Sequence, residues 1–173
     1  QLGGFTSSDI ALLTTTQVAA LKTSQVVALS ATNIRALTTT QLGALTTTQI
    51  GSLTSAQMSA LSSTQFDALS TTQIAVLKTT QINAVSTTVI SSLDATDLQA
   101  LSTTQMNALS TTQIGTLTET QLSTLTTSQI AALTVANISG LKTTQIAALS
   151  DTQFAALTTT QITSLTSTQI SVL

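Results

Sequence analysis

Large apolar residues recur along this chain with a period of eight. Leucine stands at every eighth position up to Leu173, except that Phe5 and Val85 take its place in two repeats. We number each octad from this residue, which is position one. Position six is a second apolar column, which begins at Ile10 and is never interrupted by a polar residue. Both columns are therefore expected to form the core.

The positions between these columns are small or polar. Position two is nearly always Ser or Thr, position five nearly always Gln, and position eight mostly Ala or Ser. The charged residues fall only at positions two, three, five and seven. They are Asp9, Lys22, Arg35, Asp67, Lys78, Asp94, Asp97, Glu119, Lys142 and Asp151. This distribution predicts that positions two, three and seven face solvent and that positions four and eight are close-packed small sites.

An eight-residue period does not fit one continuous helix. Eight residues at about 100° each overshoot two turns by roughly 80°, so the leucine column would wind around a long helix without forming a stripe. The period also matches neither the heptad nor the eleven-residue repeat of coiled coils. The backbone must therefore change direction once in every octad, or run as β-structure.

The residues after each leucine carry the signals of a helix start. In the stretch Leu109–Leu117, Ser110 is an N-cap candidate and Gln113 follows three residues later, which is the spacing of a capping box. Leu109 and Ile114 then occupy the two positions of a hydrophobic staple, whose side chains meet across the helix start. One rule thus accounts for positions one, two, five and six together.

Acidic residues in other octads agree with this interpretation. Asp94 replaces Ser at the N-cap, and Glu119 and Asp151 fall at the first helical position, where the positive end of the helix favours an anion. Three lysines at position two cannot accept a capping bond, and one valine at position five cannot return one. These exceptions, where we expect weaker helix starts, are Lys22, Lys78, Lys142 and Val89.

We predict an all-α solenoid of very short capped helices, one per octad, spanning positions three to eight. A helix of about six residues is unstable alone, so each must be stabilised by its neighbours. The array is predicted to be a single continuous unit over 1–173, with two or three octads in each turn. A β-solenoid remains the alternative, because Thr and Ile favour strands and an even period preserves the facing of side chains.

The repeat unit Leu-Thr-Thr-Thr-Gln-Ile-x-Ala resembles octapeptide arrays in very large secreted surface proteins of Gram-negative bacteria. The resemblance covers essentially the whole chain and is closest in four stretches. These are Leu37–Leu45, Leu45–Leu53, Leu69–Leu77 and Leu157–Leu165. It implies an extended stalk or fibre in an adhesin-like protein, and it supplies no catalytic or ligand residue.

The composition argues against most chemistry. The chain has no His, Cys, Trp, Tyr or Pro, and its net charge is −2. A zinc site, an imidazole base, a disulfide framework and a basic surface for nucleic acid are therefore not expected. Asp94 and Asp97 suit helix capping better than acid–base work, and Gly3–Gly4 is too isolated for a phosphate loop. We predict no catalytic, cofactor-binding or metal-binding residue, and no enzyme activity.

The expected function is that of an extracellular, non-enzymatic structural repeat, forming a rod or a self-associating surface fibre. Its expected partner is the chain itself, by stacking; we expect no nucleic-acid partner and no membrane span, because apolar runs are far shorter than the roughly 20 residues required. Gln1–Leu2 already reads as positions five and six, without a signal peptide, as in a segment of a longer array. The alternatives are a monomeric adhesin stalk and an ice-binding module with threonine rows.

Overall fold

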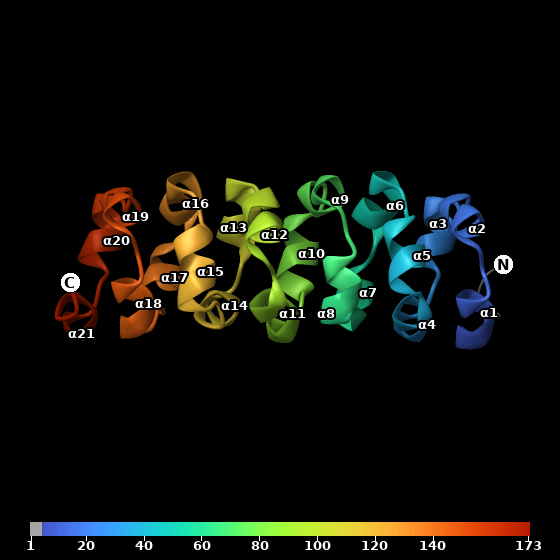
Figure 1. The fold of residues 1–173 in the computed structure, drawn as a ribbon, viewed down its shortest axis with the longest axis horizontal. Coiled ribbons are helices and arrows are strands. Elements are labelled where there is room, and N and C mark those ends of the chain that lie inside the picture. Colours follow the sequence, from blue (N-terminus) through green and yellow to red (C-terminus); the bar gives the residue numbers. More distant parts are fainter. Residues whose placement is uncertain (1–4) are drawn as a thin grey trace. The chain divides into compact units, whose positions relative to one another are not determined.

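The chain folds into a series of very short helices in a computed structural model, which describes residues 5–173. Gln1–Leu2 and Gly3–Gly4, mentioned above, lie outside the described residues. Every helix begins at position three and ends within its own octad, and short connections join successive helices (Figure 1). The N-cap at position two is extended, as at Thr38 before α5. No described residue is in a strand, so the α-solenoid prediction is confirmed and the β-solenoid is wrong for residues 5–173.

The first ten helices are α1 (Ser7–Ala11), α2 (Thr15–Ala19), α3 (Thr23–Val27), α4 (Ala31–Ala36), α5 (Thr39–Gly43), α6 (Thr47–Ser52), α7 (Ser55–Ala60), α8 (Ser63–Asp67), α9 (Thr71–Ala75) and α10 (Thr79–Ala84). They are followed by α11 (Thr87–Ser92), α12 (Ala95–Ala100), α13 (Thr103–Ala108), α14 (Thr111–Gly115), α15 (Glu119–Thr124), α16 (Thr127–Ala132), α17 (Val135–Ser139), α18 (Thr143–Ala147), α19 (Asp151–Ala155), α20 (Thr159–Thr163) and α21 (Ser167–Ile170).

The helix starts follow the predicted capping rule. In α5, Thr38 is the N-cap, its hydroxyl accepts a bond from the backbone N–H of Gln41 at 3.1 Å, and its own N–H donates to Gln41 Oε1 at 2.8 Å. Lys22, Lys78 and Lys142 make no side-chain cap bond, as expected, but their backbone N–H groups still donate to the glutamine of the octad. The helix forms at these positions because half of the reciprocal pair remains.

Residues 1–89 and 90–173 are two compact units, each built in the same way. In the first, helices pack against the helix three places later, as in the series α1, α4, α7 and α10. In the second, the series α12, α15, α18 and α21 follows the same rule. Each turn of the solenoid therefore contains three octads, which is one of the two values that the sequence left open.

The core consists of the two apolar columns, as predicted. Position six is fully buried in most octads, for example at Ile50, Ile74 and Ile114, and the leucines at position one are nearly so. Phe66 fills position six with 1% of its surface exposed, so it is a larger core side chain. Burial of the columns supplies the stabilisation that such a short helix lacks by itself.

The prediction for position four is wrong. Its residues, such as Thr48 and Thr120, are exposed throughout the described octads, whereas position eight is mostly half-buried. Position four is the second residue of each helix, and the turn of the helix points it away from the buried side chains at positions five and six. Small size at position four therefore does not reflect close packing.

Candidate functional site

The glutamine found at position five of most octads makes hydrogen bonds both within its own octad and to an earlier one. Gln49, in α6, is 2% exposed, and its Oε1 accepts a bond from the N–H of Thr46 at 2.6 Å, which completes the capping box. The spacing of Thr46 and Gln49 in the sequence predicts this bond. It does not predict that the amide nitrogen is buried and donates further hydrogen bonds.

The amide nitrogen of the same side chain binds the preceding turn. Gln49 Nε2 donates to the carbonyl oxygens of Val18 at 3.2 Å, Ala19 at 3.1 Å and Leu21 at 2.6 Å. These carbonyls lie at the C-terminal end of α2 and in the connection that follows it, where a helix has no internal partners for its last oxygens. One amide thus satisfies the start of its own helix and the end of another.

This arrangement recurs through both units. Gln81 donates to Ile50 and Leu53, each at 2.9 Å, and Gln153 donates to Leu122 at 2.9 Å and Leu125 at 2.7 Å. In both cases the acceptors lie 31 and 28 residues before the donor. We call this series of cross-turn bonds the glutamine row. Within each unit it links a turn to the one before it by bonds whose donors are buried side chains.

Burial of the row depends on the presence of a preceding turn. In the first described turn, the Oε1 atoms of Gln17 and Gln25 accept bonds from the N-cap backbone of their own helices. The Gln17 side chain is nevertheless exposed, and the Gln25 side chain is half-buried. The glutamines from Gln41 onwards are buried, and those from Gln41 to Gln81 lie on helices that pack against a preceding turn of the same unit. The first turn therefore presents amides to solvent that later turns use internally.

The two asparagines at position five show how side-chain length matters. Asn33 Nδ2 donates to the carbonyl of Phe5 at 2.9 Å, and Asn137 Nδ2 donates to that of Leu109 at 3.2 Å. These are the nearer of the two acceptors that a glutamine reaches, and within the described residues Asn137 makes no bond to the farther one, the carbonyl of Met106. The asparagine side chain is one methylene shorter, so it spans only the nearer acceptor. Val89 has no side-chain amide, but its backbone N–H still donates to Ser86 Oγ at 3.3 Å.

All acidic residues except Asp67 lie at the N-cap or in the first turn of a helix, as the sequence predicted for Asp94, Glu119 and Asp151. Asp94 Oδ1 accepts a bond from the N–H of Asp97 at 2.8 Å, and Glu119 and Asp151 are the first residues of α15 and α19. The hydroxyl and the backbone N–H of Thr6 both donate to Asp9 Oδ2, and these bonds hold the pKa of that carboxyl below its ordinary value. Their geometry serves the helix starts and not a shared acid–base centre.

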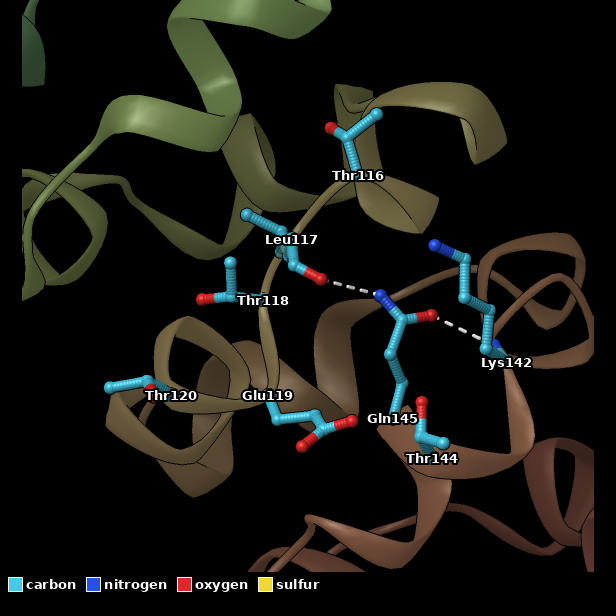
Figure 2. Close-up of a pocket in the computed structure, with 8 residues that line it drawn as sticks. All are labelled: Thr116, Leu117, Thr118, Glu119, Thr120, Lys142, Thr144 and Gln145. Carbon is cyan, nitrogen blue, oxygen red and sulfur yellow. Dashed lines mark hydrogen bonds between the residues drawn. The ribbon is translucent and has the colours of Figure 1, made fainter.

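A shallow groove lies between the α14–α15 connection and the start of α18. Its volume is about 370 Å³, and it is lined by Thr116, Leu117, Thr118, Glu119, Thr120, Lys142, Thr144 and Gln145. Figure 2 shows the glutamine row at its base, where Gln145 Nε2 donates to the Leu117 carbonyl at 2.6 Å and Lys142 N–H donates to Gln145 Oε1 at 2.8 Å. The groove is thus a seam between successive turns, with hydroxyl groups on its walls.

Residues 5–173 contain no group of three His, Cys, Asp or Glu side chains that could hold a metal ion. In the same part of the chain, no helix has the length and apolar character needed to cross a bilayer. Lys22, Lys78 and Lys142 are exposed N-cap residues.

Comparison with known families identifies the repeat. The model of the ALTTAQ repeat matches four times, at residues 20–55, 53–87, 90–127 and 130–167, which together cover most of the chain. The chain belongs to the ALTTAQ repeat family. A search of curated proteins gave no match. The predicted octapeptide array is confirmed by the ALTTAQ match, and the surface-protein context stays a prediction.

The motif itself held one signal for the cross-turn role of the ALTTAQ glutamine. A capping box accepts Glu as readily as Gln, yet position five is never Glu in this chain. A carboxylate can accept the bond from the N-cap but cannot donate. Amides therefore fill most of these positions, although Asp9, Asp97 and Val89 show that position five also accepts side chains that cannot donate.

Proposed function

We propose that this chain is a non-enzymatic structural repeat of an extracellular or cell-surface protein, serving as a spacer or as the building block of a self-associating fibre. The observation that supports it best is the glutamine row. Within each unit, successive turns are tied together by buried amide–carbonyl bonds, so turns of this kind can be added without a change in their core. A spacer must be able to lengthen by the addition of turns, whereas an active site has no such requirement.

The surface supports the same proposal. Outward-facing positions carry hydroxyl and small side chains with very few charges, and the net charge is only −2. A low density of like charges weakens the repulsion between neighbouring molecules. The resemblance to octapeptide arrays of secreted bacterial surface proteins adds the extracellular location to the proposal.

Electron microscopy of the purified chain tests the structural role. We expect either separate elongated particles or filaments, and a collapsed globular particle would contradict the proposal. Labelling of intact producing cells with an antibody against the chain tests the location. Signal that requires permeabilised cells would contradict an extracellular role.

A second candidate function follows from the threonine positions. Thr48, Thr72 and Thr120 are exposed members of position four, and most octads carry Thr there. Regular rows of exposed threonines suit binding to ice. Thermal hysteresis of a solution of the chain tests this candidate. Its absence would remove the ice-binding alternative and leave the structural role unaffected.

A further inference from the structure

Position five loses its amide in two successive octads at one place in the chain. The residues there are Val89 and Asp97, and the other octad without an amide at this position is that of Asp9. The boundary between the two compact units falls directly after Val89, within the octad formed by residues 85–92. This octad is therefore unusual both in its sequence and in its place in the fold.

The register of the glutamine row identifies the oxygens that Val89 faces. Gln81, one octad earlier, donates to two carbonyls that lie 31 and 28 residues before it, each at 2.9 Å. The same register from Val89 leads to the carbonyls of Met58 and Leu61, and all three residues are buried in the first unit. A valine side chain has no proton to donate, so it gives these two oxygens no cross-turn bond.

The two oxygens differ in what else they bind. The carbonyl of Met58 accepts a bond from the backbone N–H of Leu61 at 3.2 Å. Among residues 5–173, none donates a hydrogen bond to the carbonyl oxygen of Leu61, whereas the equivalent oxygen of Leu53 accepts the amide of Gln81. A carbonyl that gives up its water on folding and gains no donor weakens the folded state.

The start of α11 is weakened by the same valine. Ser86 Oγ accepts the backbone N–H of Val89 at 3.3 Å, but valine has no oxygen to accept the N–H of Ser86 in return. In the neighbouring helix α10, Lys78 N–H donates to Gln81 Oε1 at 2.7 Å. The helix start and the link to the preceding turn are therefore both weaker in α11 than in α10.

We propose that the octad at residues 85–92 is a built-in point of opening, which detaches from the preceding turn before the other octads of the first unit do. A helix of this length is unstable without its contacts to neighbouring turns. The octad with the fewest bonds to the preceding turn therefore opens at the lowest free energy. The opening is local, because each repeat contacts only its neighbours.

This inference rests on the proposed spacer function and gives the spacer a place to lengthen. Tension along the chain favours the octad that opens most easily. Eight residues in a fully extended conformation span at most about 29 Å. Opening of one octad thus supplies a short extension while the turns that keep their glutamine bonds stay folded.

Hydrogen exchange of the full chain, followed by mass spectrometry, tests the point of opening. After correction for intrinsic rates, the amides of residues 85–89 are expected to exchange about tenfold faster than those of residues 77–81, as for the loss of one well-formed hydrogen-bonding group. Val89→Gln restores the donor and the capping acceptor, and it is expected to slow exchange at residues 85–89 by about tenfold. Equal exchange in the two segments of the unsubstituted chain would overturn the inference.

Two control substitutions separate the missing donor from other effects. Val89→Leu supplies a side chain close in size to glutamine without polar atoms, and Val89→Glu supplies the capping acceptor without a donor. Neither is expected to slow exchange at residues 85–89, and either one slowing it as much as Val89→Gln would overturn the inference. Gln81→Val makes the reverse change and is expected to speed exchange at residues 77–81 by about tenfold. Circular dichroism establishes that each variant is folded.

Stretching of single chains held at both ends tests the link to the spacer function. We expect a first step of at most about 29 Å at low force, before the units unfold, and no such step in Val89→Gln. Unfolding of the units without an earlier short step would overturn the point of opening. Elongated particles under the electron microscope would still support the spacer function in that case, whereas a collapsed particle would contradict the spacer function itself.

Discussion

Replacing Gln57 by Glu isolates the donor half of the glutamine row. The substitution changes one –NH₂ group to an oxygen and preserves the shape of the side chain. Gln57 is 2% exposed, its Oε1 accepts from Thr54 N–H at 2.8 Å, and its Nε2 donates to the carbonyls of Val26 and Leu29, both at 2.8 Å. The variant keeps the capping bond and loses these two cross-turn bonds, together with a longer one to the carbonyl of Val27 at 3.4 Å.

The expected loss of stability follows from these contacts. Two buried carbonyls lose their amide donor, at about 1–3 kcal/mol each, so Gln57→Glu should lower the free energy of unfolding by roughly 3 kcal/mol or more at pH 7. Burial beside carbonyl oxygens raises the pKa of the new carboxyl. Its destabilisation therefore grows as the pH rises above the ordinary pKa of Glu, and is smaller near pH 4, where the protonated group can donate one bond.

The first turn supplies a matched control for this substitution. Gln17 occupies the same octad position and accepts the same capping bond, from Thr14 N–H at 2.8 Å, but it is exposed and has no cross-turn bond. Gln17→Glu is expected to change the free energy of unfolding by less than about 0.5 kcal/mol. Urea unfolding followed by circular dichroism, at pH 7 and pH 4, compares the two. Equal effects at both positions would refute the cross-turn role of the amide.

Three further predictions concern other positions. A Cβ on Gly140 would lie 2.3 Å from Thr111 Cγ2, whereas a Cβ on Gly115 would have nothing within 4 Å. Gly140→Ala should therefore lower the melting temperature and Gly115→Ala should raise it. A melting temperature that changes in the same direction in both variants would contradict this prediction. Lys78→Ser supplies the missing cap acceptor and should stabilise the chain by about 1 kcal/mol in urea unfolding, an increase that is absent if the cap is unimportant. The Asp9 carboxyl should titrate below the usual range for Asp by NMR, because two bonds favour its ionised form, and a normal pKa would rule out that capping contact.

Local rules predicted the helices well. The capping box and the staple depend on residues no more than five positions apart, so Ser110, Gln113, Leu109 and Ile114 could be assigned from the sequence. The two core columns were predicted for a similar reason, because variation among repeats shows which positions tolerate only apolar residues. Both are confirmed.

The longer-range contacts could not be predicted in this way. The amide of Gln145 binds the carbonyls of Ile114 and Leu117, almost four octads earlier in the chain. This pairing is determined by the three octads in a turn, a number that no local rule supplies. The error at position four has a related cause. Small residues such as Thr48 are compatible with both a packed site and an exposed helix start, and only the direction of the side chain distinguishes them.

The distance between spin labels within the first unit tests the central claim, a solenoid with three octads in each turn. Thr48 and Thr72 are exposed residues on α6 and α9, which pack together, and Thr64 lies between them in sequence on α8. We expect the labels at 48 and 72 to be closer than those at 48 and 64, with backbones about 10 Å apart as for packed helices. A distance that simply increases with sequence separation would contradict the account.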